Sequence, residues 1–429
     1  MISKLRPFAF ACMLAAATLP TGQAAAETPA REVALRACSA LLARVAAYPG
    51  DGPVFLRSYD STLGEGIGTE PVLGGAFTYD NALAIIALQA CGEDTAARRV
   101  GDALLAATQS DRLGSQGRLR NAYRPGPITE HPVPPMGWWS EQDKRWVEDP
   151  YQVGTATGNV AWAALALLTL AEATGDESYL AGAAKLADWA VAATYDARQP
   201  AGFSGGIYGY DDRPDRQTWK STEHNTDLAA VFDWLLRLQP DEKWRTNAQI
   251  ARGFVAAQWD AASGHFWVGT TPDGSTPNRG NAGLDAQLWP LLLEEAPPAW
   301  QASIHHAEQA HGIARQNVLM GFDFNDDRDG VWWEGTAQAA LLYRALGRTQ
   351  DADRLFVAMI DQFSPGGMIW ATDSAQITTG FALSPTSTTA DFYYYRLPHL
   401  GATAWAALAA TGWNPLTGVR LAGDLGESN

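Results

Sequence analysis

Two kinds of helix-period segment alternate along this 429-residue chain, and their alternation limits the possible folds more than any other feature. Six segments are amphipathic and charged on one face: residues 31–48, 95–109, 178–194, 243–259, 300–314 and 352–363. Six others are almost uncharged after their first turn: residues 79–91, 157–173, 222–238, 283–296, 334–346 and 401–411. Because the two kinds alternate strictly, the pattern predicts six helical hairpins.

The difference between the two sets predicts how the hairpins pack. Helices that are apolar all round are buried, whereas helices with one apolar stripe cover them. The sequence therefore predicts an all-α fold, an (α/α)6 toroid, with six buried inner helices and six amphipathic outer helices. Strand-like alternation is scarce, which argues against a sheet-based core. We expect residues 27–429 to form one catalytic domain of this kind.

Residues 1–26 carry the three parts of an export signal. Lys4 and Arg6 form a basic start, residues 7–20 form an apolar run, and "QAAA" offers a cleavage site after Ala26. The apolar run is too short to cross a bilayer, and no later segment approaches about 18 uninterrupted apolar residues. We therefore expect an exported protein, periplasmic or extracellular, with no membrane insertion.

The charge of the chain restricts its partners. The net charge is −16, and loss of the signal would make it two units more negative. Nucleic acids and anionic lipids need clustered Lys and Arg, so neither is an expected partner. A neutral or weakly charged substrate fits this balance.

Two cysteines, Cys38 and Cys91, follow the signal. In an oxidising compartment they could form a disulfide, or they could be two small buried side chains. Their spacing matches no metal or redox motif, and we predict no cofactor.

The connections between the predicted helices differ in length on the two sides. Those from an inner helix to its outer partner are short, such as "GED" and "TGDE", whereas those back to the next inner helix are long and rich in Gly, Trp, Tyr and Asp. The long loops should therefore gather at the face where the inner helices begin. Binding residues concentrate on such loops, so this face is the predicted mouth of a central pit.

Most predicted inner helices open with acidic residues. The carboxylates are Asp80, Glu223 with Asp227, Asp285, and Glu334, while Asn159 and His399 stand at the other two starts. Each carboxylate taken singly could be a helix cap, because acidic groups favour helix N-termini. As a set on buried helices they should converge and raise one another's pKa. Hydrolysis of a glycosidic bond needs such a pair, one carboxyl group protonated and one ionised.

Aromatic residues around the predicted mouth suit sugar rings, whose C–H faces stack on flat side chains. We predict that a substrate would be bound by aromatic residues of the loops and helix starts, aided by two polar neighbours of Glu223: Tyr79, Trp138, Trp139, Trp332, Trp333, Trp370 and Tyr394, with His224 and Asn225. Packing of the long loops against the helix ends is the alternative role for these aromatic side chains.

Six hairpins, acidic inner-helix starts and Trp-rich loops resemble the six-hairpin glycosidase superfamily of (α/α)6 toroids. The segments "TYDNAL", "STEHNTDLAAVF" and "DGVWWEGTAQAALLY" are similar to those of secreted or periplasmic bacterial members that act on polysaccharides. The resemblance covers the whole chain after the signal. It implies a glycoside hydrolase, often inverting, that acts on a polysaccharide or oligosaccharide.

Within that pattern we predict Glu223 as the general acid and Asp80 as the base. Asp227 lies one turn after Glu223 on the same face, where a like charge raises the pKa values of both. Asp285 and Glu334 are substitutes for the base, and the acid and base assignments could be exchanged.

Two other functions remain open at this point. A polysaccharide lyase would need basic residues for uronic acids, for which Arg118, Arg120, Arg124 and Arg396 are candidates, although the predicted mouth is acidic. A glycan-binding or assembly protein would keep the toroid without the chemistry.

One segment resembles a calcium loop. Residues 323–334 place Asp323, Asn325, Asp327 and Glu334 at positions 1, 3, 5 and 12 of the template, but Arg328 stands where glycine is required. We therefore favour a hydrogen-bonded turn that leads Glu334 into the pit. His224 and His399 lack the spacing of a metal-binding pair, so no metal site is predicted.

Overall fold

The computed structural model describes residues 28–63, 68–113, 117–129 and 137–421. The predicted export signal, residues 1–26, lies outside the described residues. Within them, no helix combines the length and hydropathy that a membrane crossing requires.

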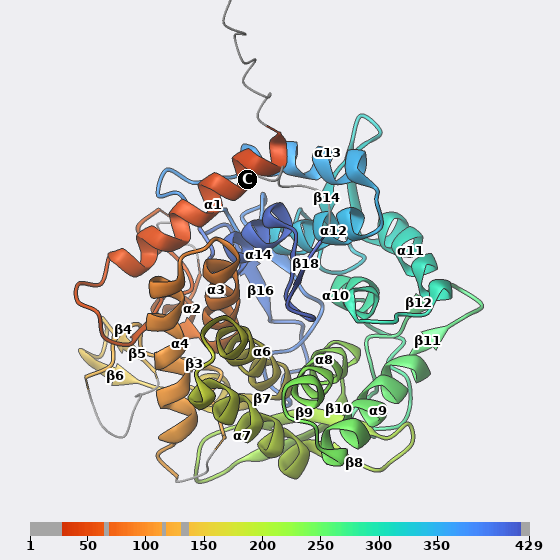
Figure 1. The fold of residues 1–429 in the computed structure, drawn as a ribbon. Coiled ribbons are helices and arrows are strands. Elements are labelled where there is room, and N and C mark those ends of the chain that lie inside the picture. The colour runs from red at the N-terminus through yellow and green to blue at the C-terminus, as the bar shows by residue number, and fades with distance from the viewer. Residues whose placement is uncertain (1–27, 64–67, 114–116, 130–136, 422–429) are drawn as a thin grey trace, which may run out of the picture.

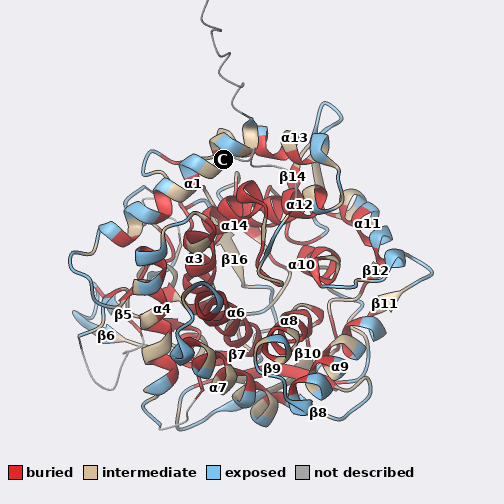
Figure 2. Cartoon of the chain, viewed as in Figure 1, coloured by how far each residue is buried: buried red, intermediate tan, exposed pale blue. Residues whose placement is uncertain are grey.

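Six inner helical segments form a closed ring (Figure 1). In chain order they are α3 (Thr78–Ala90), α6 (Thr157–Thr174), α8 (Thr222–Leu238), α10 (Leu284–Leu288) continued by the 3-10 helix η2 (Trp289–Leu292), α12 (Trp333–Ala345) and α14 (Leu400–Thr411). Each packs against the next, and α14 packs against α3 to close the ring. Their side chains are almost all buried, because they face neighbours on every side (Figure 2).

The outer layer surrounds this inner ring, and its solvent face carries most of the exposed residues (Figure 2). It consists of α1 (Pro29–Ala46), α4 (Asp94–Gln109), α7 (Glu177–Thr194), α9 (Glu242–Ala257), α11 (Ala302–Ala310) preceded by the 3-10 helix η3 (Pro298–Gln301), and α13 (Thr349–Ile360). The first of these, α1, packs against α14, so the two ends of the helical array meet. The mainly helical prediction and its alternation of buried and covering helices are confirmed.

Two predicted helices differ from their observed bounds. The segment 283–296 forms only α10 and η2, because Pro290 lacks the N–H that a continuing α-helix would need. The segment 300–314 stops being helical at Ala310, after which Gly312–Arg315 forms a strand. Both differences lie in the fifth hairpin.

Short secondary structure fills the long connections and did not follow from the sequence pattern. The additional helices are η1 (Ser61–Leu63), α2 (Glu70–Gly74) and α5 (Pro150–Val153). One four-stranded sheet contains β7 (Thr155–Ala156), β8 (Tyr195–Asp196), β9 (Gly202–Tyr208) and β10 (Asp215–Lys220). It is antiparallel and lies at the start of α8, where β10 leads directly into that helix.

The remaining strands form antiparallel pairs. They are β1 (Val54–Phe55) with β4 (Gly126–Pro127), β2 (Ala76–Phe77) with β3 (Ala122–Tyr123), β5 (Trp138–Ser140) with β6 (Arg145–Val147), β11 (Trp259–Asp260) with β12 (His265–Phe266), β13 (Gly312–Arg315) with β14 (Val318–Phe322), β15 (Gln376–Thr378) with β16 (Tyr393–Tyr395), and β17 (Trp413–Asn414) with β18 (Val419–Arg420). None of these pairs forms the core, which agrees with the prediction.

A disulfide joins the two layers. Cys38 on α1 and Cys91 at the end of α3 are bonded, with their Cα atoms 5.8 Å apart. Of the two alternatives left open by the sequence, the structure therefore shows the bridge.

Candidate active site

Five carboxyl groups from four inner helices gather at the face where these helices begin. We call Asp80, Glu223, Asp227, Asp285 and Glu334 the carboxyl cluster. Like charges within the cluster act on three of its members: Asp80 and Glu223 raise the pKa of Glu334, Glu223 and Glu334 raise that of Asp285, and Glu223 and Asp285 raise that of Asp227. The predicted convergence of these side chains is thus present in the structure.

The cluster is largely removed from water. Glu223 is half-buried and the other four members are buried. Burial raises the pKa of Glu223 to about 7, and it is also the largest cause that raises the pKa of Glu334 to about 7. For Asp227 and Asp285, burial followed by like charges raises the pKa well above its ordinary value. Several members therefore hold protons near neutral pH, as an acid catalyst must.

His399 lies between two members of the cluster. Its Nε2 is 3.3 Å from Oδ2 of Asp80, and its Nδ1 is 3.6 Å from Oε2 of Glu334. This placement follows from the ring, because His399 caps α14, which packs between α3 and α12. Burial lowers the pKa of His399, but the two carboxyl groups outweigh burial and the net shift is upward.

A second chain of hydrogen bonds reaches Glu334 from the other side. Trp405 Nε1–H donates to the Tyr79 hydroxyl over 2.9 Å, and that hydroxyl donates to Glu334 Oε1 over 2.6 Å. Glu334 Oε2, in contrast, has no hydrogen-bond partner among the described residues. One oxygen of Glu334 is therefore fixed and the other is available.

Gly401, in the first turn of α14, lies against the carboxyl groups of Asp80 and Glu334. A Cβ built on it would come within 2.7 Å of Asp80 Oδ1 and 2.8 Å of Glu334 Oε2. Both contacts are closer than real Cβ atoms make. The position therefore requires a residue without a side chain for the two carboxyl groups to come together.

Three tryptophans pack further along the inner helices. The rings of Trp162, Trp289 and Trp405 lie 5.2 to 5.9 Å apart, and Tyr79 meets Trp162 edge-on. All three indoles are almost completely buried. They close the inner ring next to the cluster and supply the low-dielectric surroundings that raise its pKa values.

The start of α8 shows why so many polar residues crowd there. Ser221 caps the helix by accepting from His224 N–H, whereas Thr222 donates to the carbonyl of Trp267. The Asn225 amide bonds both backbone groups of Phe203 and the Ser221 carbonyl. This corrects the predicted sugar contact of Asn225, because its amide is engaged in holding β9 against α8.

Two of the other predicted binding residues, Tyr394 and Tyr79, lie near the carboxyl cluster. Tyr394 stays close to the cluster, with its ring 6.1 Å from that of His399, and Tyr79 contacts Glu334 directly. His224 lies beside Trp219, and burial lowers its pKa to about 4, so it is neutral near pH 7.

The tryptophans predicted as platforms differ in exposure. Trp332 and Trp333 are buried, so the structure assigns both to the core in place of an exposed sugar platform. Trp138 is also buried, whereas Trp139 is 42% exposed and pairs with Trp146 on the β5–β6 hairpin. Trp370 is half-buried beneath the Arg396 guanidinium.

Four residues of the site were not among the predicted ones. His399, Trp405, Gln338 and Tyr59 contact or surround the cluster: the Tyr59 ring stacks on His399 at 4.3 Å, and Gln338 lowers the pKa of Asp285. His399 could have been found from its place at the start of an inner helix. Tyr59 precedes a loop and has no such sequence signal.

The arginines considered for a lyase have other partners. Arg120 bonds Asp111 and Asp211, and Arg118 donates to the Thr155 hydroxyl. In the described part of the chain, no Lys or Arg acts on the pKa of Glu223, Asp227 or Asp285. Among the described residues, these three carboxyl groups are therefore influenced by burial and by other acids and not by Lys or Arg.

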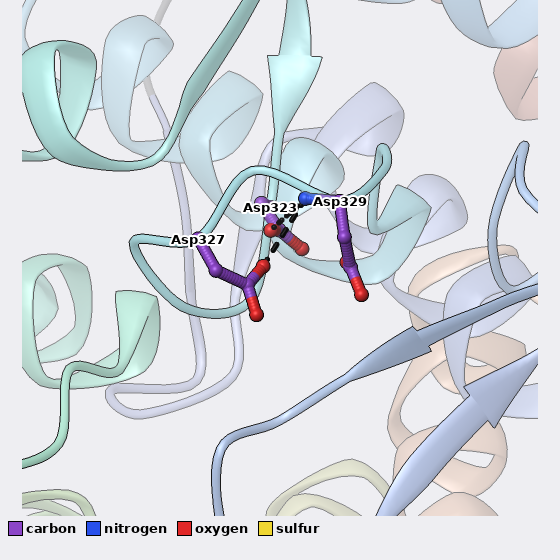
Figure 3. A group of neighbouring side chains, drawn as sticks. All are labelled: Asp323, Asp327 and Asp329. Carbon is purple, nitrogen blue, oxygen red and sulfur yellow. Dashed lines mark hydrogen bonds between the residues drawn. The ribbon is translucent and has the colours of Figure 1, made fainter.

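The segment that resembles a calcium loop forms a turn closed by its own hydrogen bonds. Asp323, Asp327 and Asp329 face one another, with ligand atoms within 4.8 Å, and the Asp329 N–H donates to both other carboxyl groups (Figure 3). Glu334, position 12 of the template, points to Tyr79 instead. This agrees with the predicted turn that leads Glu334 into the site.

Comparisons with known proteins find resemblance in structure only. No protein-family model matches the chain, and no curated protein matches it in sequence. A wild-type glycosidase matches with a TM-score of 0.57 and 14% identity over 89% of this chain and 96% of its own. A GH76 α-mannanase of Bacteroides thetaiotaomicron matches with a TM-score of 0.56 and 12% identity over 89% and 98%.

A D-mannose isomerase is similar to the same degree, with a TM-score of 0.57 and 12% identity over 90% of this chain and 97% of its own. At such identities a likeness shows the fold alone. The predicted resemblance to six-hairpin glycosidases is confirmed at that level: this chain has the fold of these glycosidases along nearly its whole length.

Proposed function

We propose that this chain is a glycoside hydrolase of the (α/α)6-toroid type, acting on a polysaccharide or oligosaccharide. The observation that carries the proposal is the carboxyl cluster, in which Glu223 and Glu334 both have a pKa of about 7. A glycosidic bond is hydrolysed by one protonated and one ionised carboxyl group, and the cluster supplies both states near neutral pH.

The ring suggests which two groups act. Figure 1 shows α8 and α14 on opposite sides of the inner ring. Glu223 is on α8 and Asp80 is on α3, and α6 packs between these two inner helices. We propose Glu223 as the general acid and Asp80 as the base, the pair that the sequence predicts.

The reaction then balances with one water. Glu223 gives its proton to the oxygen that links the two sugars, and the bond from that oxygen to the anomeric carbon breaks with its electron pair on oxygen. Asp80 takes a proton from a water molecule whose oxygen bonds to the anomeric carbon. Because the water attacks the anomeric carbon directly, without a covalent intermediate, we propose inversion at that carbon.

Export is part of the proposal. The signal-like residues 1–26 and the disulfide support a periplasmic or extracellular enzyme, because disulfides persist in oxidising compartments. N-terminal sequencing of the protein recovered from the periplasm or medium tests this, with Glu27 expected as the first residue. A chain that starts at Met1 and stays in the cytoplasm would contradict it.

A screen of the purified protein tests the activity. Reducing ends released from a panel of neutral, amino and acidic polysaccharides are measured for the wild type, Glu223→Gln and Asp80→Asn. We expect release from at least one polymer, lost by roughly 10³-fold or more in both variants while binding is retained.

Each alternative has its own outcome in the same screen. An ultraviolet-absorbing unsaturated product would indicate a lyase, although the acidic site argues against one. Conversion of free mannose without hydrolysis would indicate an isomerase, the activity named for one structural neighbour. Glycan binding that is unchanged in both variants, with no product, would indicate a non-catalytic protein.

A further inference from the structure

Two tryptophan side chains stand side by side on the solvent face of the β5–β6 hairpin. Trp139 and Trp146 are directly opposite each other in the strand register, and they are 42% and 44% exposed. Their ring centroids lie 5.9 Å apart, with an interplanar angle of 76°. In the described part of the chain, no other tryptophan is exposed to this degree. Because exposed apolar patches mark binding surfaces, the pair calls for a ligand.

The hairpin holds the two indoles in fixed positions. Its inward-facing side chain, Trp138, is buried against Gly74 of α2, where an added Cβ would come within 2.5 Å of Trp138 Cβ. On the other strand, the Arg124 guanidinium lies 3.9 Å from the centroid of the Trp146 ring. A pair of indoles that is already ordered loses little conformational entropy when it binds a ligand.

The chain leads from this hairpin to the carboxyl cluster. Tyr151, on α5, lies five positions after Trp146. Burial raises the pKa of the Tyr151 hydroxyl, and Asp80 and Glu223 raise it further, so this side chain lies near both groups of the proposed acid–base pair. Five positions of chain reach at most about 18 Å between Cα atoms. The hairpin is therefore a near neighbour of the proposed active site.

Half-buried aromatic rings surround Tyr151. Its ring lies 6.4 Å from that of Phe77 and 6.4 Å from that of Phe392, and Phe392 stacks with Tyr394 at 5.9 Å. The helix α2 packs against β5 and leads through β2 into α3, which carries Asp80. Figure 1 shows the hairpin, in yellow, at the edge of the molecule. We therefore expect a sugar chain that leaves the cluster past Tyr151 to extend toward the hairpin.

We propose that Trp139 and Trp146 form a distal subsite, which binds the polysaccharide several sugar units away from the bond that is cleaved. The proposal rests on the proposed hydrolase function and deepens it, because it makes a long polymer a better substrate than a short oligosaccharide. Sugar rings present apolar C–H faces that stack on indoles. The charges of the hairpin pair with one another, Lys144 with Glu141 and Arg145 with Asp143, so the surface suits an uncharged polymer.

The size of the patch favours a sugar chain over a protein partner. An aromatic side chain can bury about 150–250 Å², so the exposed parts of two indoles amount to roughly 200 Å² at most. A stable protein interface covers about 800 Å² on each partner. The paired indoles are therefore too small to form such an interface by themselves, whereas one or two sugar rings would cover them.

The double variant Trp139→Ala, Trp146→Ala tests the distal subsite in kinetics. On the polysaccharide that the wild type hydrolyses, we expect KM to rise roughly tenfold or more while kcat stays within roughly twofold, because the ground state and the transition state both use the distal contact. On the shortest oligosaccharide that is still cleaved, neither constant should change. The matched control is Tyr195→Ala, an aromatic residue of β8 that is 42% exposed, and it should leave both substrates unaffected.

Affinity electrophoresis measures the binding without hydrolysis. The Asp80→Asn protein is run through native gels that contain mannan, dextran, xylan or the polymer that the wild type hydrolyses, with and without the two tryptophan substitutions. We expect at least one polymer to retard Asp80→Asn, and to retard the triple variant much less. Gels without polymer correct for differences in charge and shape.

Several results would overturn the distal subsite. Equal losses on the polymer and on the short oligosaccharide would give the two tryptophans a structural role, and unchanged kinetics in the double variant would give them none. A wild-type dimer that becomes a monomer in the double variant, measured by light scattering, would assign the surface to self-association. If the wild type hydrolyses no substrate, the proposed function fails and the gels decide alone: no retardation of Asp80→Asn, or equal retardation of both proteins, overturns the subsite.

Discussion

The carboxyl groups of the site have different surroundings, and these surroundings determine their pKa values. Burial raises the pKa of both Glu223 and Glu334 to about 7, and the pKa of Glu334 is also lowered by His399 and raised by Asp80. Substitutions at and around these groups should therefore separate the acid from the base.

The first prediction concerns the alkaline limb of the pH profile of kcat/KM. A general acid must be protonated, and the raised pKa of Glu223 keeps it so up to a pH of about 7. We expect kcat/KM to fall as pH rises through that value. In Glu223→Gln the activity should return for substrates with good leaving groups, without this limb. If Glu223→Gln lost the same factor in kcat/KM for substrates with good and with poor leaving groups, Glu223 would not be the acid.

The second prediction concerns Gly401. A methyl group there would push Asp80 and Glu334 apart, so we expect Gly401→Ala to lose roughly 10²-fold in kcat. The matched control is Gly253→Ala on α9, where a Cβ meets nothing within 4 Å. That control should keep full activity and gain about 0.5–1 kcal/mol in free energy of unfolding. Wild-type activity in Gly401→Ala would show that the two carboxyl groups need not be adjacent.

At the scale of elements, the helices were predictable because their apolar periodicity extends over three or more turns. Residues 157–171 are apolar on almost every side, and α6 is buried along this length apart from Asn159. The failure at residues 283–296 has a local cause, since Pro290 interrupts the helix and the remaining turns are 3-10. Most of the strands escaped prediction because they have only two or three residues, which is too short to show an alternating pattern.

The site was only partly predictable for a related reason. A helix start places one carboxylate at the mouth of the ring, so Asp80, Glu223, Asp285 and Glu334 could each be found from the sequence. Which of them meet depends on the order of helices around the ring and on side-chain directions. The contact between His399 and Asp80 joins residues more than 300 positions apart, and no local pattern encodes it.

The third prediction concerns the link between two elements. The Cys38–Cys91 bond closes a loop with a sequence separation of 53, which corresponds to about 4 kcal/mol of stability in the chain-entropy model. We expect the double variant Cys38→Ser, Cys91→Ser to unfold at lower denaturant concentration, and a reducing agent to shift the wild type but not the variant. Coincident unfolding curves would show that packing of α1 on α3 and α14 suffices.

For the whole molecule, the buried acids link stability to pH. Asp227 and Asp285 have a pKa raised by burial, so the native protein holds protons that the unfolded chain has released. Native protein thus binds more protons in the window between the ordinary and the raised pKa, and its stability falls as pH rises through that window.

The fourth prediction follows from this sign. Each such group contributes about 1.4 kcal/mol per pH unit within its window. We expect Asp227→Asn to flatten the decline of Tm between pH 5 and pH 8, with the larger gain at pH 8. Asp188→Asn, on the exposed face of α7, is the control and should leave the slope unchanged. A slope for Asp227→Asn that equals the wild-type slope would show that Asp227 is ionised in the native protein.

The meeting of α1 with α14 also determines the order in which this molecule can form. Of the described helices, α1 is synthesised first and has its main partner in α14, the last, so the apolar stripe of α1 is covered only after α14 has been made. Contacts between distant segments form slowly because the loop between them must first close. The bond from Cys38 to Cys91 gives α1 an earlier anchor on α3, only one hairpin later. We therefore expect the disulfide to aid assembly as well as stability, because it can hold α1 against α3 before α14 is in place.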